Sequence, residues 1–429
     1  MVTRALPIRS LRQRRERRPP DWGFVAATLA LTALGLLMSY STTFFWEEGV
    51  TTFLRQAAFA ALGLAAFVAT ANADYGIARR YAVRIMLVCL ALLVAVLLFG
   101  EEHFGARRTL LNNSVQPSEV AKVGLIIYAA AWLSSRREQV RSFMDGLIPF
   151  GIIAGSVAFL VVIQPDFSTA AVLVLIALVM FFLAGASIQQ MVLVFLVALL
   201  AFAGLTQLFP HAVKRIQGFI SLWSTAGEPD YHIRQSLISL GEGGLFGNGL
   251  GAGRQKFGFL PTPHHDSVVA VLGEEMGLVG LVATLVLFVI FAWRGIVIAH
   301  HADTAFGAFV AVGIVAWVIG QMLLNVLAVL ALIPFTGMPM PFLSQGGSSL
   351  VALLASAGLV VSVSRGSRVL IEPSSSIGDQ GGKHVYAGAP FRRRHRRSRF
   401  ARLDRLGGTE QASARFTSIV RWRRKRYGA

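Results

Sequence analysis

Residues that can take a proton or hold an anion gather near position 266. His264, His265 and Asp266 stand at the start of an apolar run, and Glu274 and Glu275 follow two helical turns further in. An unpaired charge buried in a membrane costs several kcal/mol, so these carboxylates need partners or a function. Asp266 is a candidate functional carboxylate, and a Lys or Arg from another helix would serve as the partner of Glu274.

Asp266 has two other interpretations. It directly precedes the apolar run, so it could cap that helix. Together with His264 and His265 it could also bind a metal ion, although this tripeptide alone is a weak metal signature. Lys256 and Arg254 lie nearby in the sequence, which is more than a cap requires and favours a site for an anionic group.

A second polar group occupies residues 105–122, GARRTLLNNSVQPSEVAK. Its Pro-Ser dipeptide predicts a helix start with Ser118 as the cap. Lys122 follows Glu119 by three residues, so both side chains share one helical face. They form either a structural pair or a functional cation with its own counter-ion. With Arg108, the segment is suited to phosphate.

Two further loops carry polar residues next to apolar runs. The QPDFST sequence predicts a helix cap at Asp166 or Ser168, which is a structural role. Residues 333–350 contain three prolines and three glycines, which predict a stiff, folded turn. Ser348 and Ser349 can cap the helix that follows it.

The elements that carry these residues are apolar helices. Of the 429 residues, 55% are hydrophobic and only 14% are charged, which is outside the range of soluble globular proteins. The single cysteine, Cys89, excludes an internal disulfide. We predict an all-α polytopic membrane protein with about ten transmembrane helices. The apolar runs cover about 23–41, 53–72, 83–99, 119–134, 147–163, 169–186, 190–208, 267–292, 304–332 and 348–364.

The net charge of +18 lies at the two ends of the chain. We expect a basic cytoplasmic segment at 1–22, a membrane domain at 23–366, and a basic, disordered cytoplasmic tail at 367–429. A large extracytoplasmic loop, 209–266, then falls between the seventh and eighth spans. Anionic lipid headgroups are the expected partner of the tail and are favoured over nucleic acid.

These motifs together resemble the SEDS family (shape, elongation, division and sporulation), the FtsW/RodA type of membrane protein. The resemblance runs in family order over nearly the whole membrane body. The matching stretches are GARR and QPSE.AK within 105–122, QPDFST at 164–169, KRI at 214–216, Tyr231 with Gln235-Ser236, 243–266, GEEMG at 273–277, and 325–349.

The resemblance implies a ten-helix fold and the polymerisation of lipid II into glycan strands outside the cytoplasmic membrane. It also implies a class B penicillin-binding protein as partner, within a divisome or elongasome. In that family the catalytic aspartate corresponds to Asp266. The substrate-binding candidates are Lys122, Glu119, Arg108, Arg215, Gln235, Ser236, His264, Lys256, Ser348 and Ser349.

The chain departs from the family pattern at Thr109, where the family usually has a tryptophan beside Arg108. We therefore expect different stacking contacts with substrate. No bound cofactor is expected, although a loosely held divalent cation, Mg or Mn, could share the charge of the pyrophosphate. Two other functions stay open: a flippase for a lipid-linked precursor, and a non-catalytic scaffold of the wall-synthesis complex.

Overall fold

The computed structural model describes residues 12–45, 48–103, 106–109, 116–207, 210–223 and 231–372. Their contacts separate a large unit, residues 18–366, from a smaller one that contains two strands. In the smaller unit β1 (Arg12–Arg17) pairs antiparallel with β4 (Ser367–Glu372). The start of the tail is thus a strand, because pairing with β1 satisfies its backbone groups. The rest of the expected disordered tail lies outside the described residues.

Helices build the large unit, and the prediction of an all-α polytopic membrane protein is confirmed. Each predicted apolar run lies at a described helix. These are α1 (Trp22–Thr43), α2 (Gly49–Asn72), α3 (Tyr75–Phe99), α4 (Pro117–Ser135), α5 (Ile148–Ile163), α6 (Phe167–Leu183), α7 (Ile188–Gln207), α10 (Val268–His300), α11 (Ala305–Val329) and α12 (Gly347–Ser364).

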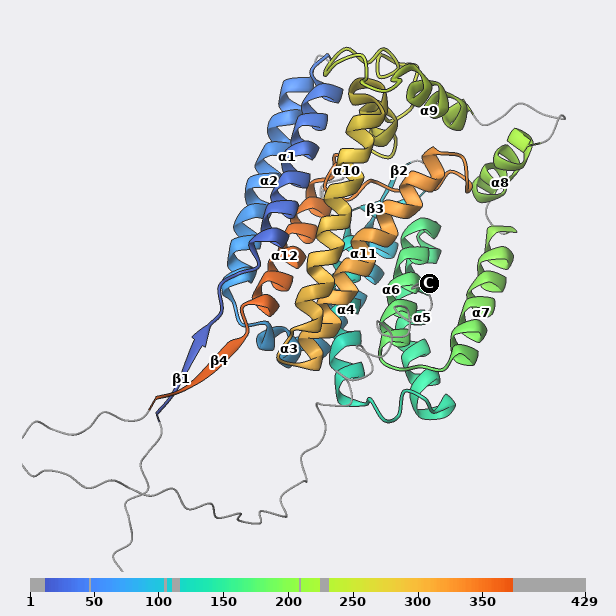
Figure 1. The fold of residues 1–429 in the computed structure, drawn as a ribbon. Coiled ribbons are helices and arrows are strands. Elements are labelled where there is room, and N and C mark those ends of the chain that lie inside the picture. The colour runs from blue at the N-terminus through green and yellow to red at the C-terminus, as the bar shows by residue number, and fades with distance from the viewer. Residues whose placement is uncertain are drawn as a thin grey trace, which may run out of the picture. The chain divides into compact units, whose positions relative to one another are not determined.

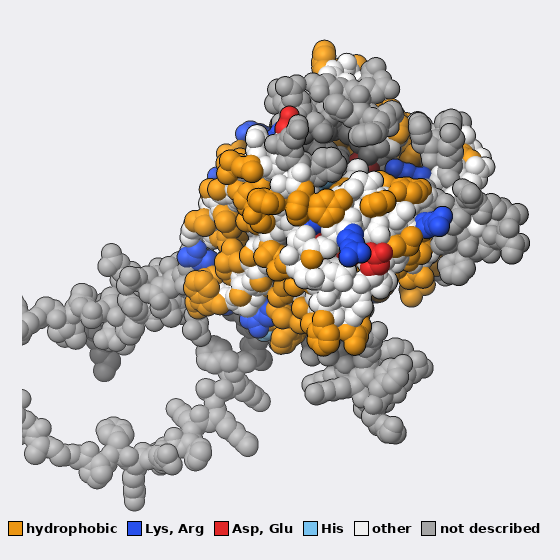
Figure 2. Space-filling view, turned by 90° about the horizontal axis from the view of Figure 1, so that it is seen from above, with side chains coloured by type: hydrophobic (Ala, Val, Ile, Leu, Met, Phe, Trp, Pro, Cys, Tyr) orange, Lys and Arg blue, Asp and Glu red, His pale blue; other side chains and the backbone are white. Residues whose placement is uncertain are grey.

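Seven of the described helices are long and apolar enough to cross a membrane, with α5 extended by a π-helical turn, η1 (Phe143–Leu147). α6 and much of α7 are apolar but shorter. The exact count of ten crossings stays a prediction. Figure 2 views the described residues from above, along the helices of Figure 1, and shows hydrophobic side chains mixed with some Lys and Arg. Large hydrophobic side chains are also exposed along the helices, for example Leu62 of α2, Leu87 of α3 and Leu285 of α10, and such helix sides suit lipid contact.

The large loop between the seventh and eighth predicted spans is itself folded. It contains α8 (Pro210–Trp223) and α9 (Tyr231–Glu242), and α9 lies near one end of α10 (Figure 1). A short hairpin of β2 (Glu101–His103) and β3 (Ala106–Thr109) precedes α4.

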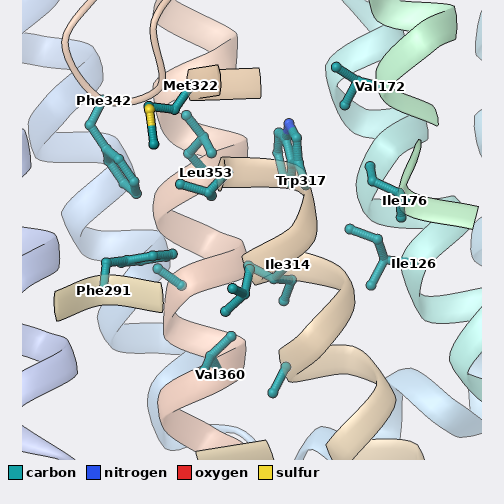
Figure 3. Close-up of a cluster of buried hydrophobic side chains, with 14 of the residues drawn as sticks. Ile126, Val172, Ile176, Phe291, Ile314, Trp317, Met322, Phe342, Leu353 and Val360 are labelled. Carbon is teal, nitrogen blue, oxygen red and sulfur yellow. The ribbon is translucent and has the colours of Figure 1, made fainter. Parts of the chain in front are cut away.

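α11 runs through the middle of the core. Trp317 and Ile314 of α11 lie among side chains of α4, α6 and α12 (Figure 3). The loop after α11 passes close to α1 at Gly35, where a Cβ would lie 2.0 Å from the Phe342 carbonyl oxygen. Only glycine permits that approach, which holds the 333–346 loop against the bundle.

α10 is broken near its start, at Gly277, whose φ is +65°. Residues 243–249 fill the break. The amides of Leu278 and Val279 donate to the carbonyls of Gly244 and Leu245, at 3.0 and 3.1 Å. The loop amides of residues 248 and 249 donate in turn to the helix, at 3.0 Å each. The glycine-rich sequence therefore keeps the interrupted backbone hydrogen-bonded.

Candidate functional site

Asp266 lies just before α10, half-buried, and is not its cap. The helix begins at Val268, and its N-cap residue is Ser267, whose side chain makes no capping hydrogen bond. The Asp266 carboxylate instead accepts a hydrogen bond from the Thr262 hydroxyl. The capping interpretation of Asp266 is therefore wrong, and this carboxylate is available for another role.

The backbone of residues 264–266 is held by α11 and the loop that follows it. Three consecutive carbonyls each accept one hydrogen bond. The donors, in order, are the Gln345 amide at 2.9 Å, the Ser344 hydroxyl, and the Asn325 side-chain amide at 2.9 Å. Asn325 of α11 is 2% exposed, and sequence spacing could not indicate that it would hold the backbone of Asp266.

Arg215 of α8 and Asp266 both lie next to Gly337. The Arg215 guanidinium donates to the Thr336 carbonyl at 3.2 Å, and the Ser168 hydroxyl donates to the same oxygen at 2.6 Å. A Cβ at Gly337 would lie 3.3 Å from Arg215 Nη2 and 3.6 Å from Asp266 Oδ2. A guanidinium and a carboxylate thus flank one glycine.

Lys122 belongs to a second cluster of polar side chains, which is buried among α4, α11 and α12. Its ammonium donates to Glu119 at 2.7 Å and to the Gln321 side-chain carbonyl at 2.9 Å, and it lies 4.9 Å from the centroid of the Trp317 ring. The Ser349 hydroxyl donates to the other Glu119 oxygen at 3.0 Å. α4, α11 and α12 therefore meet at this lysine.

One side of α11 connects the two groups. Gln321 and Asn325 lie one turn apart, and their side-chain amides donate to consecutive loop carbonyls. Gln321 binds the Pro339 carbonyl at 2.9 Å, and Asn325 binds that of Met338 at 2.6 Å. Because Gln321 also contacts Lys122 and Asn325 also contacts Asp266, the loop places both groups at one end of the bundle.

The predicted serine caps are corrected by the structure. α4 begins at Pro117 without a side-chain cap, so Ser118 is inside the helix. α12 likewise lacks one: Ser348 accepts from the Gln116 amide at 3.1 Å, and Ser349 binds Glu119. Both serines brace α12 against the start of α4, a contact between distant segments that local sequence could not indicate. Asp166, in contrast, caps α6 as predicted, accepting from the Thr169 amide.

Lys256 is fully occupied by its own chain. Its ammonium contacts Glu275 at 2.6 Å, the Gly251 carbonyl at 2.9 Å, and the hydroxyl and carbonyl oxygens of Ser41 at 3.0 and 3.1 Å. The Phe45 ring centroid lies 4.7 Å away. An ammonium has three N–H donors, and these contacts use all of them. Lys256 therefore connects its own loop, around residues 251–256, to α1 and α10.

Glu274 has a different partner from the one expected. Its carboxylate accepts from the backbone amides of Arg254 and Gln255 and from the Ser239 hydroxyl, the last at 3.2 Å. Backbone amides pointing at the carboxylate replace the basic side chain, because the loop folds directly over α10. Hydrogen bonds of this kind stabilise a buried carboxylate.

The remaining candidate substrate-binding residues lie in different parts of the structure. Ser236 is buried, and its hydroxyl donates to the His232 carbonyl within α9 at 2.9 Å. Gln235 is half-buried on the same helix. Arg108 belongs to β3, and its side chain lies outside the described part of the structure.

His264 is half-buried, with its ring 4.9 Å from that of His265. Burial, and secondly the neighbouring imidazole, lower the pKa of His264 to about 4. It is therefore neutral at physiological pH and can exchange hydrogen bonds but supplies no positive charge. Among the described residues, no three His, Cys, Asp or Glu side chains are arranged to hold a metal ion, so the metal interpretation gains no support.

The sequence of residues 22–369 matches the FtsW/RodA/SpoVE family, described as cell cycle protein. Stage V sporulation protein E of Bacillus subtilis strain 168 is 39% identical over 358 residues, covering 81% of this chain and 98% of the relative. The probable peptidoglycan glycosyltransferase FtsW of Geobacter sp. strain M18 is 35% identical over 343 residues, covering 78% and 94%.

Solved structures share the fold. A chain from a peptidoglycan synthase complex that coordinates polymerization and crosslinking aligns with a TM-score of 0.67 at 26% identity, covering 81% of this chain and 98% of that chain. The rod shape determining protein RodA of Thermus thermophilus aligns with a TM-score of 0.61 at 28% identity, covering 81% and 97%. The family match spans the whole helical unit with the site just described, and the chain therefore belongs to the FtsW/RodA/SpoVE family.

Proposed function

We propose that this chain is a peptidoglycan glycosyltransferase that polymerises lipid II into glycan strands at the outer face of the cytoplasmic membrane. One observation carries the proposal: the Asp266 carboxylate and the Arg215 guanidinium flank Gly337, on a loop that also contacts the Lys122 group. A base next to a cation suits the transfer of a sugar from a pyrophosphate. The names of the FtsW relatives support the same activity.

In the proposed reaction, Asp266 takes the proton of the acceptor sugar hydroxyl as its oxygen attacks the anomeric carbon of the donor. The bond between that carbon and the pyrophosphate oxygen breaks, and the electron pair leaves with the pyrophosphate. No general acid is required, because pyrophosphate is a good leaving group. Arg215 and Lys122 stabilise the charge that develops on it, with Arg108 as a further candidate.

A loosely held divalent cation could share this charge, bound mainly by the pyrophosphate itself. Among the described residues that border Gly337, Asp266 is the one that carries a carboxylate. Such a cation would therefore bind with substrate rather than in a preformed protein cage.

The membrane arrangement follows from the charge distribution. Both basic termini lie in the cytoplasm, and the loop with α8 and α9 faces out. The lipid tail of the substrate then lies along the apolar helices, and its sugars reach Asp266 and Arg215. A class B penicillin-binding protein is the proposed partner, since a glycan strand must be crosslinked after polymerisation. Anionic lipids are the proposed partner of the basic tail.

The test is reconstitution of the purified full chain, alone and with its cognate class B penicillin-binding protein, in liposomes that contain fluorescent lipid II. We expect glycan polymer, resolved by gel electrophoresis after lipid removal. Transbilayer movement of lipid II without any polymer would contradict the proposal and favour the flippase. Neither movement nor polymer, with the partner bound, would favour a scaffold.

A further inference from the structure

Two polar contacts between α1 and α10 lie one membrane thickness apart. At one end Asp21 pairs with Arg294, and at the other the Ser41 hydroxyl donates to the Glu275 carboxylate at 2.7 Å. The two contacts are 20 residues apart along α1 and 19 residues apart along α10, with no charged residue between them on either helix. At the helical rise per residue each stretch is about 30 Å long, which matches the hydrocarbon layer of a bilayer.

The glycine-rich loop before α10 enters this layer at its Glu275 boundary. The carbonyls of Gly244 and Leu245 accept from the amides of residues 278 and 279, which lie on the Arg294 side of Glu275. The amides of residues 248 and 249 bind the carbonyls of residues 274 and 275, so the loop has returned to the boundary there. By helical rise, the lowest point of the loop lies about 5 Å inside the boundary.

The polarity of the loop follows its depth. Leu245 and Phe246, at the lowest point, are 62% and 81% exposed, whereas the polar Asn248 lies back at the boundary. Leu278 and Val279 of α10 lie at the level of Leu245 and are exposed as well. The apolar side of α10 therefore continues onto the loop without a polar interruption at this depth.

We propose that residues 244–247 form a lipid-inserted wedge, in which Leu245 and Phe246 contact the acyl chains of the leaflet at the Asp266 end of the protein. Acyl chains fit this surface, because it is apolar and lies at the depth to which interfacial segments insert. The contact follows from the membrane crossing alone and holds whatever reaction the chain catalyses. Because the wedge precedes Asp266 in the same loop, it anchors to the lipid the segment that leads to the site.

The backbone of the wedge is compatible with this depth. Irregular backbone at membrane depth needs its polar groups satisfied, and the hydrogen bonds to the break in α10 do this. Gly247 permits the close approach: a Cβ there would lie 2.2 Å from the Glu275 carbonyl oxygen. The glycines thus bring the loop against the helix, and the two large side chains point away from it.

The test places a fluorescent label on single introduced cysteines, with the parent chain as the blank because Cys89 is only 1% exposed. Phe246→Cys reports on the wedge. Glu48→Cys, exposed between α1 and α2, is the control for water, and Leu285→Cys, midway between the two polar contacts of α10, is the control for the middle of the bilayer. The full chain in liposomes is exposed to iodide on both sides of the membrane or, separately, to brominated phospholipids.

We expect lipids brominated near the head group to quench the label at position 246 about fivefold more than at 48, and iodide to quench it about fivefold less. Lipids brominated near the chain ends should quench position 285 more than 246, because the wedge lies close to the boundary. Equal iodide quenching at 246 and 48 would place the wedge in water and overturn the proposal. Quenching at 246 by neither reagent would mean that a second copy of the chain or another protein covers the wedge, which would overturn it too.

Discussion

Two lysines are buried in the described part of the chain, and they differ in what surrounds them. Lys122 and Lys256 are 1% and 2% exposed, and each is paired with one glutamate, at 2.7 and 2.6 Å. Each also lies over an aromatic ring. Lys122 contacts two side-chain oxygens and a tryptophan face, whereas Lys256 contacts four oxygens of its own chain, two of them backbone carbonyls.

This difference distinguishes a lysine that can take part in the reaction, Lys122, from one that only stabilises the fold, Lys256. The four oxygens around Lys256 use all three donors of its ammonium, so it joins the loop to α1 and α10 and has nothing left for a phosphate. Lys122 donates to two oxygens among the described residues, and Gln321, which it contacts, lies one turn from Asn325, the residue that binds the Asp266 carbonyl. Burial and a glutamate partner alone therefore do not identify a functional lysine.

The largest expected effect is on catalysis at Lys122. Lys122→Met should lower glycan polymerisation at least about a hundredfold per folded molecule, because a cation near the leaving group is lost. The variant with Lys122→Met and Glu119→Gln removes the lone buried carboxylate and should be equally inactive. Lipid II polymerisation by the purified variants measures this. Wild-type rates in either variant would make Lys122 a structural residue like Lys256.

For Lys256 we expect a loss of stability instead. Lys256→Met leaves Glu275 buried without its counter-ion, which costs about 3–5 kcal/mol in free energy of unfolding. Lys256→Met with Glu275→Leu should recover most of that loss, since an apolar pair of similar volume needs no desolvation of charge. Thermal unfolding in detergent tests both variants. A stable Lys256→Met protein with no activity would mean that Lys256 acts in catalysis and not in stability.

A third ion pair also joins α1 to α10, at the ends of these helices that lie away from Lys256. It serves as a reference for an ion pair that is partly exposed. Arg294 binds Asp21, with one contact at 2.9 Å, and the side chains are 33% and 11% exposed. Asp21→Asn keeps a side chain that can cap α1, so it removes only the charge. We expect it to lower the free energy of unfolding by about 1 kcal/mol or less and to leave polymerisation unchanged. A larger loss than that of Lys256→Met would reverse the order of these pairs.

The smallest effect concerns His264, beside the site. Its pKa of about 4 in the folded protein lies below the ordinary value of 6.5. As the pH falls from about 6.5 to about 4, the unfolded chain binds a proton that the folded protein does not, so stability falls. His264→Gln should flatten the pH dependence of the unfolding temperature in that window. An unchanged profile would mean that His264 can carry charge and would weaken the assignment of the cationic role to Lys122 and Arg215.

Local spacing predicted part of this site and could not predict the rest. Lys122 and Glu119 are three residues apart on one helix, so their pairing follows from helical geometry. The contact of Glu119 with Ser349 joins residues 230 positions apart and depends on how α12 packs on α4. The same holds for Lys256, which was expected at the substrate but binds Ser41, 215 positions away.

The apolar helices were predictable because membrane burial imposes a long hydrophobic pattern. The partner of Glu274 was not, since backbone amides can replace a basic side chain wherever a loop folds over a helix. The glycine-rich residues 243–249 lie in the loop predicted between the seventh and eighth spans. Their insertion into the break of α10 follows from tertiary contacts.

The role of Asp266 as the base is tested by the initial rate of lipid II polymerisation by Asp266→Asn, with lipid II binding and thermal unfolding measured on the same preparation. Asparagine keeps the size of the side chain and the hydrogen bond from Thr262 but cannot take a proton. We predict at least about a hundredfold loss of rate with binding and unfolding temperature unchanged. A rate within a few fold of wild type would contradict the account, because the half-buried carboxylate beside Gly337 would then not be the base.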